Sequence, residues 1–189
     1  MTKDFINVYD NAVSSNDCKS IIKIFEDDPN KSIVKGHLGN GKIDPKKKAC
    51  TELPCNFQDK DIINKILLES LSKYTPLYVK DNRELDLVIA SWSVYIGYNI
   101  QKYKPKEGYF SEHCENNGYP NGVSRMMVWM IYLNTVTDDG GTYFTNYDRT
   151  TDAVEGRLVI WPAYWTHIHK GIVSKTKTKY IATGWFSWV

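Results

Sequence analysis

The chain has 189 residues, of which 42% are hydrophobic and 24% charged, and its formal net charge is +2. This length suits one domain with a substantial core, and so small a net charge gives no strong signal for nucleic acid or an anionic membrane. Residues 1–17 show no apolar signal segment, no run is long enough to span a bilayer, and the cysteines lack CxxC spacing. We therefore expect a cytoplasmic protein with reduced thiols, and the oligomeric state stays open.

Two helices are predicted in the first part of the chain. In residues 14–28, Ser14 and Asp17 have the spacing of an N-terminal capping box, and apolar residues then recur at helical spacing. Residues 59–74 show the same period over a longer stretch. The expected buried face of this second helix consists of Ile62, Ile63, Ile66, Leu67 and Tyr74. Residues 35–55, between the helices, are rich in Gly, Lys and Pro and are expected to form a long loop with one short strand.

From residue 85 onward, short runs rich in β-branched and aromatic residues alternate with Gly, Pro, Asn and Asp. These runs are at 85–103, 124–136, 141–147, 156–165, 166–174 and 179–188. Closely spaced strands after two helices favour an α+β fold with a β-barrel or jelly-roll core and helices packed outside it. We expect one domain, residues 1–189, in which 1–82 form helical support and 83–189 form the β core.

Residues with metal-binding chemistry gather in the β-rich half. On a strand, His113 and Glu115 would face the same way, and so would His167 and His169. Two imidazoles and one carboxylate make the facial triad that leaves three adjacent positions of an Fe(II) ion open. These residues favour a mononuclear iron site and leave open whether His167 or His169 completes it.

Three blocks of this half have a distinctive order and spacing: KYKPKEGYFSEHCE, MIYLNTVTDDGGTYF and GRLVIWPAYWTHIHKGIVSKTKTKYIATGWF. Together, from Tyr103 to Phe186, they resemble the Fe(II)/2-oxoglutarate-dependent dioxygenases, and most closely the prolyl 4-hydroxylase branch. The resemblance implies a double-stranded β-helix, or jelly-roll, core with N-terminal supporting helices.

The same resemblance assigns the second histidine. In the family, the distal histidine is followed by x-Gly and, about ten positions later, by a basic residue; His169 is followed by Gly171 and Lys179 in this way. His113, Glu115 and His169 are therefore the implied Fe(II) ligands. Lys179 is the implied partner of the distal carboxylate of 2-oxoglutarate, for which a compact ammonium charge is suited.

Three further side chains have two possible roles each. Tyr103, ten residues before His113, and Tyr132 in MIYLN match family tyrosines whose hydroxyls reach the co-substrate. The alternative is that both are core aromatics with satisfied hydroxyls. His167, if it shares a strand face with His169, is a candidate to lie near the metal; the alternative is an ordinary polar strand residue.

Glu115 departs from the family, which mostly has H-x-D at this place. The extra methylene moves the carboxylate by ~1.5 Å and adds a rotor that must be fixed. We expect Fe(II) to accept the longer stem, with weaker iron binding or inactivity as the alternatives. A carboxylate here disfavours halogenation, because the halogenating relatives have a small residue instead.

The implied activity is hydroxylation of a peptidyl proline, coupled to decarboxylation of 2-oxoglutarate to succinate. The implied cofactors are Fe(II) and 2-oxoglutarate, with O2 as co-substrate and ascorbate as a further candidate, and the implied partner is a proline-containing peptide or protein. The segment from His37 to Lys48 is the expected substrate loop; its three consecutive lysines, Lys46 to Lys48, favour an acidic substrate or are simply solvated. The alternatives are another substrate (a free amino acid, another side chain, a small molecule or a modified base) or a non-catalytic β-helix binding module.

Overall fold

The computed structural model describes residues 3–27, 29, 32–120 and 122–189. Within these ranges the strands form a seven-stranded sheet of order β1-β10-β7-β12-β5-β4-β2, a three-stranded sheet β11-β8-β9 and a two-stranded sheet β3-β6. The strands are β1 (Asn7–Tyr9), β2 (Val34–Lys35), β3 (Lys48–Ala49), β4 (Thr51–Asn56), β5 (Trp92–Tyr103), β6 (Gly108–Tyr109), β7 (Arg125–Tyr132), β8 (Thr142–Phe144), β9 (Arg149–Thr151), β10 (Leu158–Pro162), β11 (His169–Gly171) and β12 (Lys179–Trp188). The helices are α1 (Ser15–Asp27), α2 (Ile62–Asp81) and the short 3-10 helices η1 (Arg83–Leu87), η2 (Thr145–Tyr147) and η3 (Trp165–His167).

Helix α1 begins where the capping box predicted. The hydroxyl oxygen of Ser14 accepts a hydrogen bond from the backbone N–H of Asp17 at 3.1 Å, and the Ser14 hydroxyl donates to the Asp17 carboxylate at 2.7 Å. The predicted end at residue 28 lies outside the described residues. The side chains that α1 buries are Cys18, Ile21 and Phe25.

Helix α2 is longer than its apolar period predicted. It begins after Asp61, whose carboxylate accepts a backbone N–H of the first turn, and it continues through Pro76 to Asp81. Ile62 is half exposed, so its assignment to the buried face is wrong; the next residue turns into the core instead. The buried face includes Ile63, Ile66, Leu67, Leu71 and Tyr78. None of the described helices has a stretch long and apolar enough to cross a bilayer.

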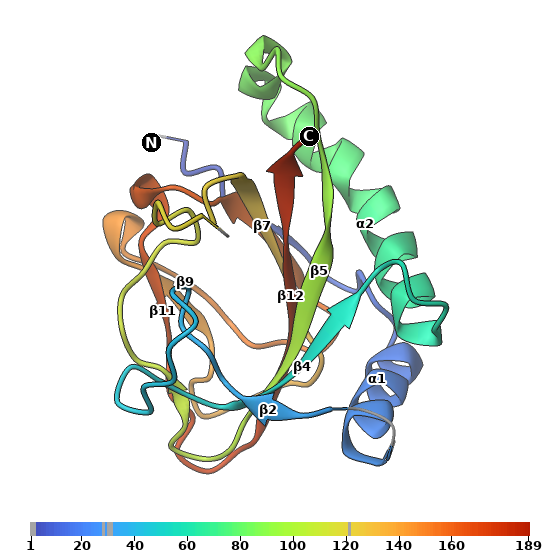
Figure 1. Cartoon of the computed structure of the whole chain (residues 1–189), viewed down its shortest axis with the longest axis vertical. Coiled ribbons are helices and arrows are strands. Elements are labelled where there is room, and N and C mark those ends of the chain that lie inside the picture. Colours follow the sequence, from blue (N-terminus) through green and yellow to red (C-terminus); the bar gives the residue numbers. More distant parts are fainter. Residues whose placement is uncertain (1–2, 28, 30–31, 121) are drawn as a thin grey trace.

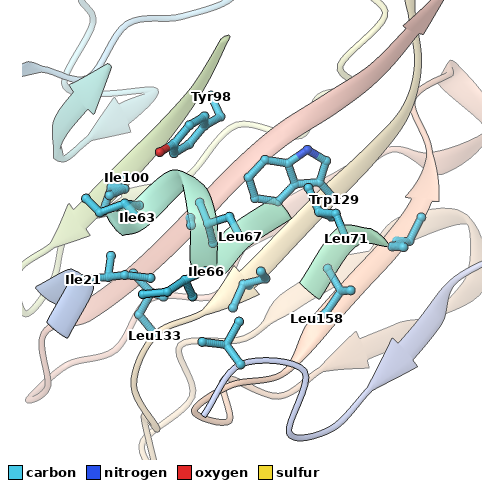
Figure 2. Close-up of a cluster of buried hydrophobic side chains, with 14 of the residues drawn as sticks. Ile21, Ile63, Ile66, Leu67, Leu71, Tyr98, Ile100, Trp129, Leu133 and Leu158 are labelled. Atoms are coloured by element: carbon cyan, nitrogen blue, oxygen red, sulfur yellow. The ribbon is translucent and has the colours of Figure 1, made fainter. Parts of the chain in front are cut away.

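The main core lies between the helices and the large sheet. Helices α1 and α2 cover one side of this sheet, and β9 and β11 lie on the other (Figure 1). Ile63 and Leu67 of α2 are fully buried with Trp129 of the sheet (Figure 2). Each such aliphatic side chain contributes about 1.5–3 kcal/mol through burial. Both faces of β7 are covered, which explains why its sequence RMMVWMIY is apolar without alternation.

The second face of the large sheet forms the interior in which the site lies. Val128, Tyr132 and Trp161 of this sheet pack with Phe144 of the three-stranded sheet. The N-terminal part of the chain is more than helical support, because β1, β2 and β4 belong to the large sheet. The sheet therefore runs across the expected division at residue 82.

We expect Gly156→Ala to destabilise the fold by about 2 kcal/mol or more. Gly156 has φ +74°, and a Cβ there would lie 2.2 Å from the carbonyl oxygen of Val13, so strained backbone adds to a contact that the main chain must relieve. Urea unfolding measures the loss. Gly41→Ala is the matched control: φ is +77° and no described atom lies within 4 Å of the added Cβ, so about 1 kcal/mol is expected. Equal losses at the two positions would contradict this reading.

Candidate metal centre

The main chain brings His113 and His169 side by side. The N–H of His113 donates to the carbonyl oxygen of His169 at 3.0 Å, and the N–H of His169 donates back at 2.9 Å. His169 begins β11, whereas His113 makes only this isolated bridge. The expectation that His113 and Glu115 lie on one regular strand is therefore wrong, but the backbone pair still brings both residues to the same place.

The three side chains then converge. Glu115 Oε1 lies 3.5 Å from His113 Nε2 and 3.8 Å from His169 Nε2, and one ligand atom of each residue lies within 4.8 Å of the other two. His113 Nδ1 lies 3.0 Å from the carbonyl oxygen of Ser111, and His169 Nδ1 lies 2.8 Å from that of His167. Because a carbonyl oxygen only accepts, each Nδ1 donates. This leaves both Nε2 atoms as lone-pair donors that face the carboxylate, the arrangement of ligands to a metal.

Electrostatics keep two of these ligands in their metal-binding protonation states. Burial, followed by the nearby His113, lowers the pKa of His169 to about 3, so its ring is neutral at pH 7. Burial alone would raise the pKa of Glu115. The close contacts with His113 and the positive charge of Arg125 outweigh burial and hold that pKa well below its usual range. Neutral imidazole and carboxylate are the forms that bind metal.

The imidazole rings are held by aromatic neighbours. The ring of Tyr109 stacks on His113 with centroids 3.6 Å apart. Trp161 meets His169 edge to face at 5.2 Å, and Phe144 lies 5.6 Å from the same ring. Packing of this kind fixes ring orientation, so the two Nε2 atoms are positioned before any metal arrives.

A cavity of about 280 Å³ joins this cluster to Lys179. Lys179 is 5% exposed, and its ammonium group donates to the carbonyl oxygen of Gly140 at 2.8 Å and lies 5.0 Å from the centroid of the Tyr103 ring. An ammonium group has three donors, and among the described residues the carbonyl oxygen of Gly140 is its one hydrogen-bond acceptor. The cavity is therefore lined by a buried ammonium group that can donate further hydrogen bonds, as well as by the three candidate metal ligands.

One face of β12 lines this cavity at alternate positions. Lys179, Ile181, Thr183 and Trp185 all contribute to the wall, as side chains two apart on a strand should. The chain bends at residues 175–176 before β12 begins, so the lysines of KTKTK do not share one unbroken strand. Lys179 is buried, whereas Lys175 is exposed.

His167 and His169 do not share a strand face, so the prediction that they do is wrong. His167 ends the 3-10 helix η3, so it and His169 belong to different elements. Its Nε2 lies 2.8 Å from the carbonyl oxygen of Asp4 and its Nδ1 lies 2.9 Å from the hydroxyl of Thr166. The change from 3-10 to extended backbone at Ile168 turns the two rings apart, and His167 anchors the N-terminal segment instead.

The two tyrosines have different positions. Tyr103 lines the cavity, and its hydroxyl donates to Gln101 Oε1 at 2.7 Å. Tyr132 is absent from the described residues that line the cavity. Its hydroxyl lies 2.8 Å from that of Thr142 and donates to the carbonyl oxygen of Thr151 at 3.1 Å. The expectation that Tyr132 reaches a co-substrate is therefore corrected: it is a core aromatic with a satisfied hydroxyl.

Sequence reasoning missed two residues that touch Glu115. Arg125 Nη1 and Trp185 Nε1 donate to Glu115 Oε2 at 3.1 and 3.0 Å. The sequence could have indicated Trp185 as a site residue, because it lies an even number of residues after Lys179 on the same strand and so faces the same side. Arg125 had no such signal, since it is brought to the site by the register of β7.

A buried polar network on another wall of the cavity was also missed. The side chain of Lys48, 6% exposed, pairs with that of Glu52, 4% exposed. Gln101 Nε2 donates to Glu52 Oε1 at 2.7 Å and links the pair to the Tyr103 hydroxyl. The consecutive lysines therefore have different surroundings: Lys47 is exposed to solvent, whereas Lys48 is buried and lines the cavity.

The sequence and the structure are similar to those of known oxygenases. Residues 98–187 match the family model of the 2OG-Fe(II) oxygenase superfamily. The structure is similar to a viral collagen prolyl hydroxylase, vCPH from Paramecium Bursaria Chlorella virus-1, in its 2OG complex (TM-score 0.70, 16% identity, 98% of this chain and 97% of that chain). It is also similar to a Pseudomonas putida prolyl-4-hydroxylase (TM-score 0.71, 13% identity, 98% and 93%). A third similar structure is a Trichoplax adhaerens prolyl hydroxylase in complex with a hypoxia inducible factor oxygen degradation domain peptide fragment (TM-score 0.74, 14% identity, 98% and 84%). No curated protein sequence matches this chain.

These matches support one class of protein. The match over residues 98–187 supports a 2OG-Fe(II) oxygenase, a dioxygenase. The fold of the chain is that of the prolyl hydroxylases, and the predicted jelly-roll core with N-terminal helices is confirmed. Identities of 13–16% to these structures establish the fold and leave the substrate to be argued separately.

Proposed function

We propose that this protein hydroxylates a proline residue of a peptide or protein, with Fe(II), 2-oxoglutarate and O2, and releases succinate and CO2. The observation that carries the proposal is one cavity lined both by a His-Glu-His cluster and by the buried ammonium of Lys179. A metal ion and a dicarboxylate that chelates it need these two features together.

The donor set fits Fe(II). His113 Nε2, Glu115 Oε1 and His169 Nε2 would hold the ion, as two nitrogens and one oxygen that leave coordination positions for other ligands. Bound iron supplies the oxygen chemistry. The protein holds the ligands: the carbonyl groups of Ser111 and His167 fix the two rings through their Nδ1 atoms.

Lys179 fits the distal carboxylate of 2-oxoglutarate. Taking an ammonium group out of water is costly unless an anion or hydrogen-bond acceptors compensate for it, and Gly140 supplies one acceptor. A carboxylate would satisfy the remaining donors and add a charge-assisted hydrogen bond. The side chains of Tyr103 and Ile181 also line the cavity and exclude water from the pair.

The same cavity is also lined by residues suited to contact a substrate. His37 and Leu38 of the expected substrate loop line it, together with Asn117 and Trp185. Gly39 of the loop approaches Asn117 so closely that a Cβ would meet its side-chain nitrogen at 2.5 Å. The three similar structures are prolyl hydroxylases, and the one from Trichoplax adhaerens contains a peptide fragment, which supports a proline-containing peptide as substrate.

A reducing compartment such as the cytoplasm suits the cysteines, which include the buried thiols of Cys18 and Cys50. Such a location also suits an enzyme that must keep its iron in the ferrous state, a task for which ascorbate is the proposed reductant. Fractionation of cells and the dependence of turnover on added ascorbate test these two points.

The proposed reaction is tested by succinate release and by the mass of peptides. With Fe(II), 2-oxoglutarate and O2, we expect succinate to form and a proline-rich peptide to gain one oxygen atom, about 16 mass units, as a hydroxylation requires. A peptide of the same sequence with each proline replaced by alanine is the matched control. Succinate formation without oxygen on any proline peptide would leave the oxygenase class standing and reject the peptidyl-proline substrate.

A further inference from the structure

The two oxygens of the Glu115 carboxylate have different partners. Oε1 faces the imidazoles of His113 and His169. Oε2 accepts hydrogen bonds from Trp185 Nε1 at 3.0 Å and from Arg125 Nη1 at 3.1 Å. Trp185 comes from β12 and Arg125 begins β7, so Oε2 is held by donors from two neighbouring strands of the large sheet.

These two donors also hold each other. The guanidinium carbon of Arg125 lies 3.6 Å from the centroid of the Trp185 ring, and Arg125 Nη1 lies 3.3 Å from the backbone oxygen of Glu115. A planar guanidinium stacked on an indole leaves its N–H groups free to donate in the ring plane. Around Trp185, β12 changes its register against β5 between Gly184 and Phe186, an irregularity of the kind that re-aims a side chain. The pair is therefore a preformed double donor.

We infer that Arg125 and Trp185 are positioning residues that let a glutamate serve as the carboxylate ligand where relatives mostly have aspartate. The longer stem of Glu115 adds one rotor, and a free carboxylate end would sample several orientations. Two hydrogen bonds to Oε2 fix that rotor and present Oε1 alone to the histidines. With Oε2 engaged, the carboxylate offers one oxygen to a metal and leaves the other coordination positions open.

This inference rests on the proposed metal site, so its test measures metal binding in the absence of 2-oxoglutarate and peptide. Co(II), which absorbs visible light when protein-bound, is titrated into the metal-free protein. Trp185→Phe keeps a ring beneath Arg125 and removes the N–H. We expect the Kd for Co(II) to rise about tenfold, as for loss of a hydrogen bond to a metal-ligating group.

Trp185→Phe is also made in a protein that already carries Glu115→Asp. This double variant distinguishes a role of Trp185 in positioning the Glu115 carboxylate from a role in stabilising the fold. Glu115→Asp withdraws the carboxylate by ~1.5 Å, so its outer oxygen no longer meets the indole. In this background we expect Trp185→Phe to change the Kd for Co(II) by less than about twofold, because two changes that act through one contact are not additive. A tenfold loss in both backgrounds, or none in the native one, would overturn the inference.

Two further variants keep the test decisive. Trp165→Phe is the matched control, because this tryptophan is 71% exposed and lies outside the cavity; its Kd for Co(II) should not change. If Trp185→Phe fails to fold, Arg125→Lys gives the same cycle, since it keeps the charge and loses the planar fork. If the native protein binds no Co(II), the metal centre itself is refuted. If it binds Co(II) and the changes are additive, only the positioning role is refuted.

Discussion

Replacing His169 by alanine is expected to abolish turnover and to weaken metal binding by at least about a hundredfold, the upper end of what even the loss of an outer-sphere partner costs. The reason is geometric: His169 Nε2 lies 3.8 Å from Glu115 Oε1, and its Nδ1 is already committed to a carbonyl oxygen. Removing it leaves two of the three proposed ligands. Co(II) titration and 2-oxoglutarate-dependent succinate release measure the two losses.

His167→Ala is the matched control for this prediction. His167 is 2% exposed, and its ring holds the carbonyl oxygen of Asp4 and packs against Tyr147 at 5.1 Å. We expect a loss of stability of about 2 kcal/mol, from the cavity and the unmade hydrogen bond, with near-normal Co(II) affinity in the folded protein. Loss of metal binding with His167→Ala but not with His169→Ala would reverse the assignment.

Replacing Lys179 by methionine is expected to raise the KM for 2-oxoglutarate by about ten- to a hundredfold, with little effect on Co(II) affinity. Methionine keeps much of the buried volume and removes the ammonium group, and a hydrogen bond between charged groups contributes about 1.5–3 kcal/mol. Lys177→Ala, in the same segment but exposed, should leave the KM unchanged. An unchanged KM in Lys179→Met would exclude this lysine as the carboxylate partner.

The pH dependence gives a second measurement of the same residue. Burial lowers the pKa of Lys179 to about 8, while the nearby Cys50 acts weakly in the opposite direction. The group is charged below this pKa and loses its charge as the pH rises through it, so the KM for 2-oxoglutarate should increase between about pH 7 and pH 9. Lys179→Arg stays charged throughout, and its KM should not show this rise. A KM that rises equally in both proteins would assign the pH effect to another group.

Much of the fold was visible in local patterns. The capping box at Ser14 and Asp17, the apolar period of α2 and the change to short β-rich runs after residue 82 each report on neighbours in sequence. The spacing of His169 and Lys179 was likewise a local signal, because ten residues of turn and strand separate two positions that line the same cavity.

The errors fell where backbone conformation depends on distant parts of the chain. The period-two argument placed His167 beside His169, but the 3-10 helix η3 interrupts the strand and turns His167 to the N-terminal segment. Tyr132 fitted the resemblance, yet its hydroxyl is satisfied within the core by Thr142 and Thr151. In both places a contact between separate elements overrides the local pattern.

The sequence by itself determined which groups are present: imidazoles and a carboxylate of the kind that bind a metal, and a lysine whose role toward a dicarboxylate is implied by the resemblance to the dioxygenases. Only the tertiary structure decided how that chemistry is used. The register of β7 against β12 brings Arg125 and Trp185 to Oε2 of Glu115 and leaves Oε1 to the histidines. A sequence fixes which donors exist, but hydrogen bonds act over about 3 Å, and only folding brings groups from separate strands within that reach.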